Sequence, residues 1–280
     1  MLEVRTITDD EVVAFRDAMM ITFGEDREDD PGGAERTRAL LDLTRGWAAF
    51  EDGVIVGTAA TSDLVVGIPG GTLPMAGLTA VTVRPTHRRR GILRELMRVH
   101  ADDARARGVA ISGLWASEAT IYGRFGYGVA AESDALEICT RGLAITVTGE
   151  RDVCEFIDEA AAREQLPAIY AQAITGRPGA LQRSPVWWRE RRFLEAPFVR
   201  RGASRRRHVL VRRGGTAVGY VVYRQRPKFE GGVPAGTTDL IELIALDPRA
   251  EASLWHFVVG IDLFPTATWA LAPVDSVLPW

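Results

Sequence analysis

Three consecutive arginines stand directly before a glycine in the segment RRRG at residues 88–91. The apolar segment before them (78–83, LTAVTV) is typical of a strand, and the segment after them (93–108, LRELMRVHADDARARG) has apolar residues at helical spacing. The first N–H groups of a helix have no partner within it, and the helix dipole adds partial positive charge there. The guanidinium groups add positive charge and hydrogen-bond donors at this helix start, and the glycine lets a ligand approach the backbone. The junction therefore predicts a site for a phosphate or diphosphate group.

The sequence of this junction differs from the two common nucleotide-binding loops. A Walker loop requires G-x-x-x-x-G-K-[ST], and a dinucleotide fold requires G-x-G-x-x-G. The remaining alternatives are a solvated basic patch and a nucleic-acid contact. The chain has 34 basic and 37 acidic residues, which gives a net charge of −3. Because the chain is net acidic, we expect no nucleic-acid partner.

Length and composition set the wider limits. A chain of 280 residues suggests about two domains. Its first residues, MLEVRTITDDEVV, lack the apolar core of a signal peptide, and no later run is long enough to cross a bilayer. We expect a cytoplasmic protein without a membrane partner. Cys139 and Cys154 lie outside any metal-like spacing, so we expect no metal.

The first half of the chain predicts the elements that hold the arginine loop. Residues 8–23 have the cap and apolar spacing of a helix, and Asp52-Gly53 is typical of a hairpin turn between two strands. After the helix at 93–108, residues 109–117 (VAISGLWAS) predict another strand. A strand–helix–strand crossover leaves the helix N-terminus open at the carboxyl end of the first strand, where ligands tend to bind.

The second half repeats this order. Residues 205–224 predict a hairpin with Gly214-Gly215 at its tip, and residues 239–258 (DLIELIALDPRAEASLWHFV) align with 78–97, with a proline between strand and helix in both. The second copy has DPRAEAS in place of the arginine loop. We therefore predict an α/β (α+β) chain of two tandem domains, 1–140 and 141–280. Each is expected to be a mixed, mostly antiparallel sheet with flanking helices, and only the first keeps the ligand.

Two motifs carry a family resemblance. Arg88-x-x-Gly91-x-Leu93 resembles the acetyl-CoA diphosphate loop of GNAT N-acetyltransferases, [QR]-x-x-G-x-[GA], from which Leu93 departs at the last position. Residues 73–96 (LPMAGLTAVTVRPTHRRRGILREL) and 116–128 (ASEATIYGRFGYG) resemble the Eis (enhanced intracellular survival) acetyltransferases. The resemblance implies a catalytic and a non-catalytic GNAT-like domain and a hexameric assembly. It also implies a C-terminal sterol-carrier-like domain, which we expect to be absent or truncated in this chain.

The resemblance also assigns residues to acetyl-CoA. One strand would pair through its backbone with the pantetheine arm, the loop would hold the diphosphate, and the end of the following strand would line the site. In that order, the residues are Val81, Thr82 and Val83; then Arg88, Arg89, Arg90, Gly91, Ile92, Leu93 and Arg94; and then Ser117 and Glu118.

Tyr122 matches the general acid of the family. A thiol with a pKa near 8.5 and a tyrosine with a pKa near 10 make the proton transfer uphill by only about 2 kcal/mol. The alternative is a packed aromatic residue alongside Phe125 and Tyr127. No Cys-His or Ser-His pairing stands out, so the amine is expected to attack the thioester directly. For His87 and His100, a loop cation and a core-facing helix residue are favoured over a catalytic base.

The resemblance further implies cationic acceptors, namely aminoglycoside-like polyamines or lysine side chains. Glu25 and Asp26, in an acidic run, are candidates for attracting them, and a solvated loop is the alternative. The family's base is the terminal carboxylate of its third domain. The predicted function is therefore an acetyl-CoA-dependent N-acetyltransferase. A catalytically inactive CoA-binding regulatory module is the alternative.

Overall fold

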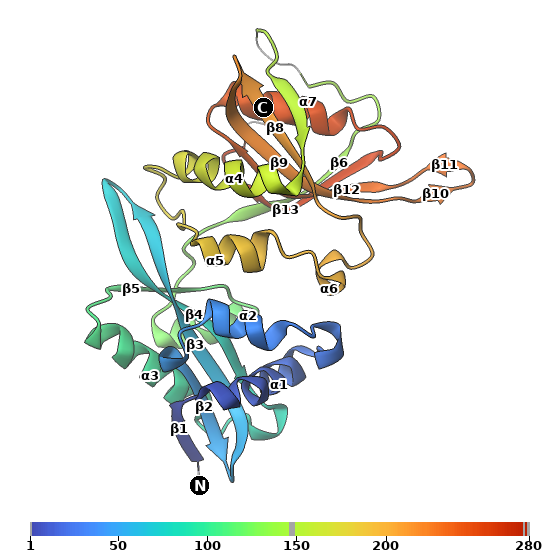
Figure 1. Cartoon of the computed structure of the whole chain (residues 1–280). Coiled ribbons are helices and arrows are strands. Elements are labelled where there is room, and N and C mark those ends of the chain that lie inside the picture. Colours follow the sequence, from blue (N-terminus) through green and yellow to red (C-terminus); the bar gives the residue numbers. More distant parts are fainter. Residues whose placement is uncertain (1, 146–148, 277, 279–280) are drawn as a thin grey trace. The chain divides into compact units, whose positions relative to one another are not determined.

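The computed structural model describes residues 2–145, 149–276 and 278. The chain forms two compact units (Figure 1), the first comprising Met1–Val129 with Gly176–Arg192 and the second Ala130–Thr175 with Phe193–Trp280. Segment 176–192, from the second half of the chain, joins the first unit through strand β3 (Val54–Ile68): Gly67 N–H donates to Ala180 O, and Gln182 N–H to Val65 O.

The first unit is a five-stranded sheet in the order β1-β2-β3-β4-β5. Neighbouring strands are antiparallel except β4 and β5, which are parallel. The strands are β1 (Leu2–Thr6), β2 (Gly46–Glu51), β3 (Val54–Ile68), β4 (Gly71–Val83) and β5 (Ile111–Leu114). The α-helices are α1 (Val12–Phe23), α2 (Gly33–Leu40), α3 (Ile92–Ala106) and α5 (Pro185–Trp187), the last continuing into a π-helical turn, Trp188–Arg192.

Helices α1 and α3 cover opposite faces of this sheet because strand residues alternate between faces. Ala48 and Phe50 pack in one cluster with the α1 residues Val12 and Phe15. Trp47 and Ala49, the intervening positions of β2, pack in another with Ile92, Leu96 and Met97 of α3. The crossover from β4 through α3 to β5 thus holds the start of α3 beside the end of β4.

The second unit is a six-stranded sheet in the order β6-β13-β12-β9-β8-β7, in which only β12 and β13 are parallel. Its long strands are β6 (Ser133–Cys139), β7 (Val153–Ile157), β8 (Arg207–Arg213), β9 (Thr216–Arg226), β12 (Thr237–Ala245) and β13 (Thr266–Pro273). A small ribbon pairs β10 (Phe229–Glu230) with β11 (Val233–Pro234). Its helices are α4 (Glu159–Ala173), α6 (Pro197–Arg200) and α7 (Pro248–Val259).

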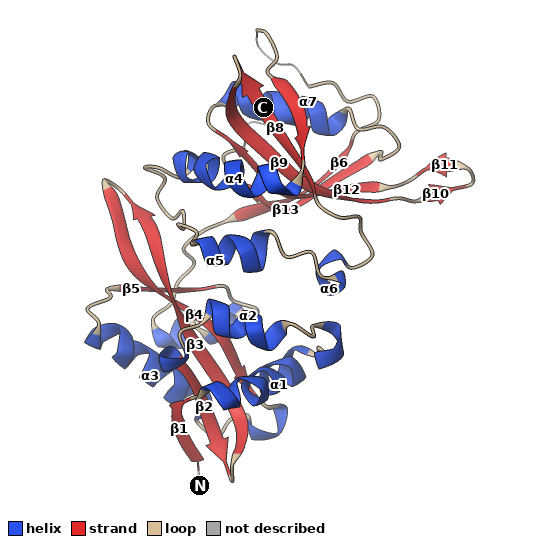
Figure 2. Ribbon diagram, in the orientation of Figure 1, coloured by secondary structure: helices blue, strands red, loops and turns tan. Residues whose placement is uncertain are grey.

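Both units have the same core order, strand–helix–three strands–helix–strand, which Figure 2 shows by element type. In each, the strand before the last helix pairs in parallel with the strand after it: β4 with β5, and β12 with β13. The strands before the helix, β4 and β12, also each have a bulge: in β4 it lies opposite Ala59 of β3, and in β12 it lies at Ile241. The predicted duplication and the predicted mixed, mostly antiparallel sheets are confirmed.

Candidate active site

The loop between β4 and α3 leaves the start of α3 open. After β4 ends at Val83, a short 3₁₀ turn covers Pro85–His87, and Arg89 and Gly91 both have positive φ, at 63° and 83°. Gly91 is the N-cap of α3 and supplies no side-chain cap, and a Cβ built on it meets nothing within 4 Å. The first N–H groups of α3 therefore have no side-chain cap, and the space beside Gly91 is open, which suits an anion.

The arginines of this loop differ in their pairing. Arg90 forms an ion pair with Glu51, which also accepts a hydrogen bond from His87 Nε2 at 2.9 Å. The hydrogen bond from Arg90 is the main reason that the pKa of Glu51 is lowered. Arg88, Arg89 and Arg94 are exposed, and no hydrogen bond or ion pair engages their side chains within the described part of the chain. Three guanidinium groups thus remain available at the helix start.

The end of β4 has a free edge. Parallel pairing with β5 stops at Leu78↔Leu114, whereas β4 continues to Val83 against β3. A bulge follows at once: Ala80 has φ 54°, and its carbonyl accepts a hydrogen bond from Thr58 Oγ1 at 2.6 Å. Thr82 is buried, and its hydroxyl lies 2.6 Å from that of Thr58, so its side chain is engaged within the sheet. An extended molecule can add to this edge.

Tyr122 lies between two short turns, Ala119–Ile121 and Gly123–Phe125. Its ring packs on the same cluster as Val81, Val83 and Leu93 and contacts Tyr127 edge-on, with ring centroids 6.0 Å apart. Burial is the main reason that the pKa of Tyr122 is raised. Among the described residues, nothing hydrogen-bonds its hydroxyl. Tyr122 therefore stays protonated near neutral pH and can donate its proton.

Behind Tyr122 is a polar network that the sequence did not reveal. Tyr127 Oη lies 2.6 Å from Ser112 Oγ and 3.2 Å from His100 Nε2, and His100 Nδ1 lies 2.6 Å from Thr61 Oγ1. His100 is 1% exposed, which confirms the predicted core-facing position, and burial lowers its pKa. The network fixes Tyr127, which packs against Tyr122.

The other predicted site residues lie on the surface. Ser117 and Glu118 are exposed just after β5, and the charge of Glu118 contributes to the raised pKa of Tyr122. Glu25 and Asp26 are exposed in the loop after α1. Within the part of the chain that the structure describes, no hydrogen bond, ion pair or shared cluster joins Glu25 or Asp26 to Tyr122. Their role in substrate binding stays a prediction.

Among the described residues, no group of three or more His, Cys, Asp or Glu side chains is placed to hold a metal ion. No helix in residues 2–145, 149–276 and 278 has the length and apolar character needed to span a membrane.

Comparisons with known proteins agree with this arrangement. Family profiles described as acetyltransferase (GNAT) domains match residues 3–130 and 179–280. An uncharacterized N-acetyltransferase of Streptomyces avermitilis is 37% identical over 98% of this chain and 67% of that protein. N-acetyltransferase Eis of Mycobacterium tuberculosis is 33% identical over 88% of this chain and 61% of that protein. The crystal structure of Eis1 from Mycobacterium abscessus matches with a TM-score of 0.80 at 29% identity, over 99% of this chain and 68% of that one.

The chain therefore belongs to the GNAT acetyltransferases. Within that class it is an Eis-like N-acetyltransferase with two GNAT domains, as the motifs around Gly91 and Tyr122 predicted. It spans between 61% and 67% of the length of the two curated relatives above.

Proposed function

We propose that this chain binds acetyl-CoA at the start of α3 and transfers the acetyl group directly to amines of cationic substrates, such as aminoglycoside-like polyamines or lysine side chains. The observation that carries this proposal is the uncapped start of α3 at Gly91, beside the free edge of β4 and the Tyr122 ring. A Cβ at Gly91 would stand in this open space, so the residues present fit a diphosphate.

In this proposal each part of the site has one task. The amides at the start of α3, with Arg88, Arg89 and Arg94, hold the diphosphate, and the backbone of residues 81–83 aligns the pantetheine arm. Bound acetyl-CoA supplies an activated thioester carbonyl for attack by the amine. Tyr122 donates its hydroxyl proton to the departing sulfur, and its raised pKa keeps that proton in place until then.

The acceptor and the assembly are proposed from the Eis resemblance. Glu25 and Asp26 would draw a cationic amine toward the site through their charge. The amine must lose a proton before it attacks, and in that family a terminal carboxylate of a third domain accepts it. A homo-hexamer is the proposed assembly, which light scattering would measure directly.

The test has two stages. Calorimetric titration of the chain with acetyl-CoA should show saturable binding that free CoA displaces. Thiol release in the presence of tobramycin or a lysine peptide, with the acetylated amine identified by mass spectrometry, should then show transfer. Binding without transfer would favour the inactive CoA-binding module. Failure to bind acetyl-CoA would refute the assignment of the site.

A further inference from the structure

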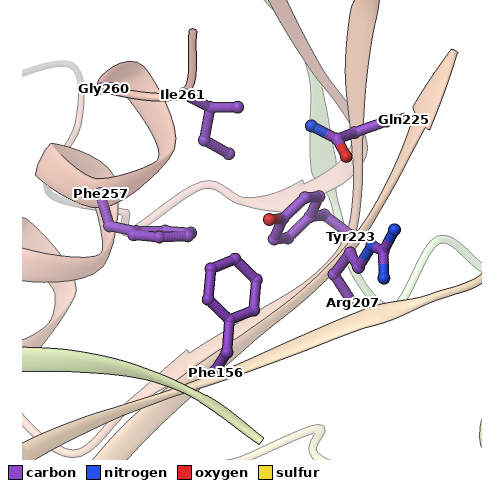
Figure 3. A pocket seen from close by; sticks show the side chains of 7 residues that line it. All are labelled: Phe156, Arg207, Tyr223, Gln225, Phe257, Gly260 and Ile261. Carbon is purple, nitrogen blue, oxygen red and sulfur yellow. The ribbon is translucent and has the colours of Figure 1, made fainter. Parts of the chain in front are cut away.

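The second unit has a pocket of about 480 Å³ beside the end of α7 (Figure 3). Three aromatic rings converge in it: Phe156 from β7, Tyr223 from β9 and Phe257 from α7. The ring centroids of Phe156 and Phe257 are 5.7 Å apart, and those of Tyr223 and Phe257 are 6.2 Å apart. The volume lies within the range of small-molecule sites, roughly 300–1,000 Å³.

The pocket exists because α7 ends before the sheet face that it covers. Val209, Val211 and Val221 face α7 in the core, and strand alternation places Arg207, Tyr223 and Gln225 on the same face, further along. Helix α7 has 12 residues, whereas α3 in the first unit has 15. The difference of three residues shortens α7 by about 4.5 Å, and the last positions of that face are left uncovered.

The equivalent place in the first unit is filled. Thr61 and Tyr223 occupy matching positions in the two units. Thr61 is opposite Leu78, the last residue of β4 that pairs with β5, and Tyr223 is opposite Leu240, the last residue of β12 that pairs with β13. Thr61 bonds His100 of α3 at 2.6 Å. Tyr223 has no such partner from α7, so the two copies have diverged at this point.

Three polar side chains are left without protein partners at the pocket. Tyr223 is only 2% exposed, and within the described residues nothing hydrogen-bonds its hydroxyl, which points toward the space between the rings (Figure 3). The side chains of Gln225 and Arg207 are likewise unpaired across the part of the chain that the structure describes. The Tyr223 hydroxyl, the Gln225 amide and the Arg207 guanidinium therefore offer hydrogen-bond donors to a molecule in the pocket.

We propose that this pocket binds a small aromatic carboxylate. The aromatic body packs on the surface formed by Phe156, Phe257 and Ile261, where edge and face contacts between rings are favourable. The carboxylate accepts hydrogen bonds from the Tyr223 hydroxyl and the Gln225 amide and lies near the Arg207 guanidinium.

The electrostatics of the pocket agree with a proton-donating tyrosine. Burial raises the pKa of Tyr223 to about 12, although the charge of Arg207 acts in the opposite direction. Tyr223 is therefore a hydrogen-bond donor throughout the physiological range. Arg207 and Tyr223 are cross-strand neighbours on β8 and β9, so both groups reach the same end of a bound molecule.

The probes for this site are 2-naphthoate and its neutral analogue 2-naphthylmethanol, titrated into the whole chain by calorimetry or ligand-observed NMR. We expect naphthoate to bind and the alcohol to bind at least tenfold more weakly. Tyr223→Phe removes only the unpaired hydroxyl and should lower the affinity for naphthoate about tenfold. Arg207→Gln should remove most of the preference for the acid over the alcohol.

Arg205→Gln is the matched control, because Arg205 is an exposed arginine that does not line the pocket. It should leave naphthoate binding unchanged. Equal affinities for acid and alcohol, no binding of naphthoate at millimolar concentration, or an unchanged affinity in both Tyr223→Phe and Arg207→Gln would overturn the proposal. Because Arg207 is exposed, its variant tests the site even if Tyr223→Phe folds poorly. Acetyl-CoA binding, measured alongside, should not respond to naphthoate.

Discussion

At the scale of single residues, Tyr122 combines packing with chemistry. The sequence offered a packed aromatic residue as the alternative to a general acid, and the structure shows Tyr122 packed while its hydroxyl has no hydrogen-bond partner among the described residues. Burial raises its pKa, which keeps the proton on but makes its transfer more uphill than for a free tyrosine.

Tyr122→Phe tests this residue directly. The substitution keeps the ring and removes the proton, so acetyl-CoA should bind with unchanged affinity. Turnover should fall by about 10² or more, the usual contribution of general acid catalysis. Calorimetry and thiol release measure the two quantities separately. Phe125→Leu, a change in the same cluster without a lost hydroxyl, is the control for packing. Unchanged turnover in Tyr122→Phe would exclude Tyr122 as the acid.

His100 gives a prediction about pH. Burial, with the charge of Arg107, lowers the pKa of folded His100 below its usual 6.5, and Asp103 acts in the opposite direction. As the pH falls below about 6.5, the unfolded chain takes up this proton first, so the free energy of unfolding should fall. Urea denaturation at pH 7.5 and 5.5 should show a smaller pH effect in His100→Gln than in the wild type. Equal pH effects would contradict a depressed pKa.

At the scale of elements, Gly91 tests whether the open start of α3 is used for binding. Gly91→Ala places a methyl group in the open space beside the helix start, at a residue with φ 83°. The positive φ should cost about 1 kcal/mol of stability, and the methyl group should lower the affinity for acetyl-CoA at least tenfold. Gly108→Ala is the matched control at the other end of α3, where φ is 68° and a Cβ also meets nothing within 4 Å. It should cost similar stability in thermal denaturation and leave acetyl-CoA affinity unchanged. Equal effects on affinity would mean that the loop geometry serves folding only.

Local patterns predicted most of these elements, because caps, turns and apolar spacing are encoded by neighbouring residues. The helix predicted over 8–23 is a 3₁₀ turn, Asp9–Glu11, followed by α1, and Asp52-Gly53 joins β2 to β3 as the expected hairpin turn. The contacts that the sequence could not reveal join distant residues. Tyr127 meets His100 across 27 positions, and residues 179–182 bond to the β3 hairpin across more than 100. Pairing of this kind depends on the folded sheet and leaves no periodic signal.

At the scale of the whole molecule, two copies of one fold have diverged at the same point, the start of the helix after the parallel strand. In the first copy, Gly91 leaves the α3 amides open. In the second, the Asp247 carboxylate accepts a hydrogen bond from Ala250 N–H at 2.9 Å and pairs with Arg213. Hydrogen bonding to Arg213 is the main reason that the pKa of Asp247 is lowered, so the cap is ionised at neutral pH. A negative charge already occupies the place where a diphosphate would bind.

This divergence predicts one acetyl-CoA per chain rather than two. Calorimetric titration of the whole chain should give a stoichiometry near one, and Gly91→Ala should weaken that single event. Asp247→Asn keeps a capping oxygen without the charge, and Asp247→Ala removes both, so the two variants should lower stability to different extents, with about 1 kcal/mol separating them. Neither should change acetyl-CoA affinity. A second binding event in the wild type, or its appearance when Asp247 is replaced, would show instead that the second copy retains a cofactor site and that its helix cap acts as a removable block.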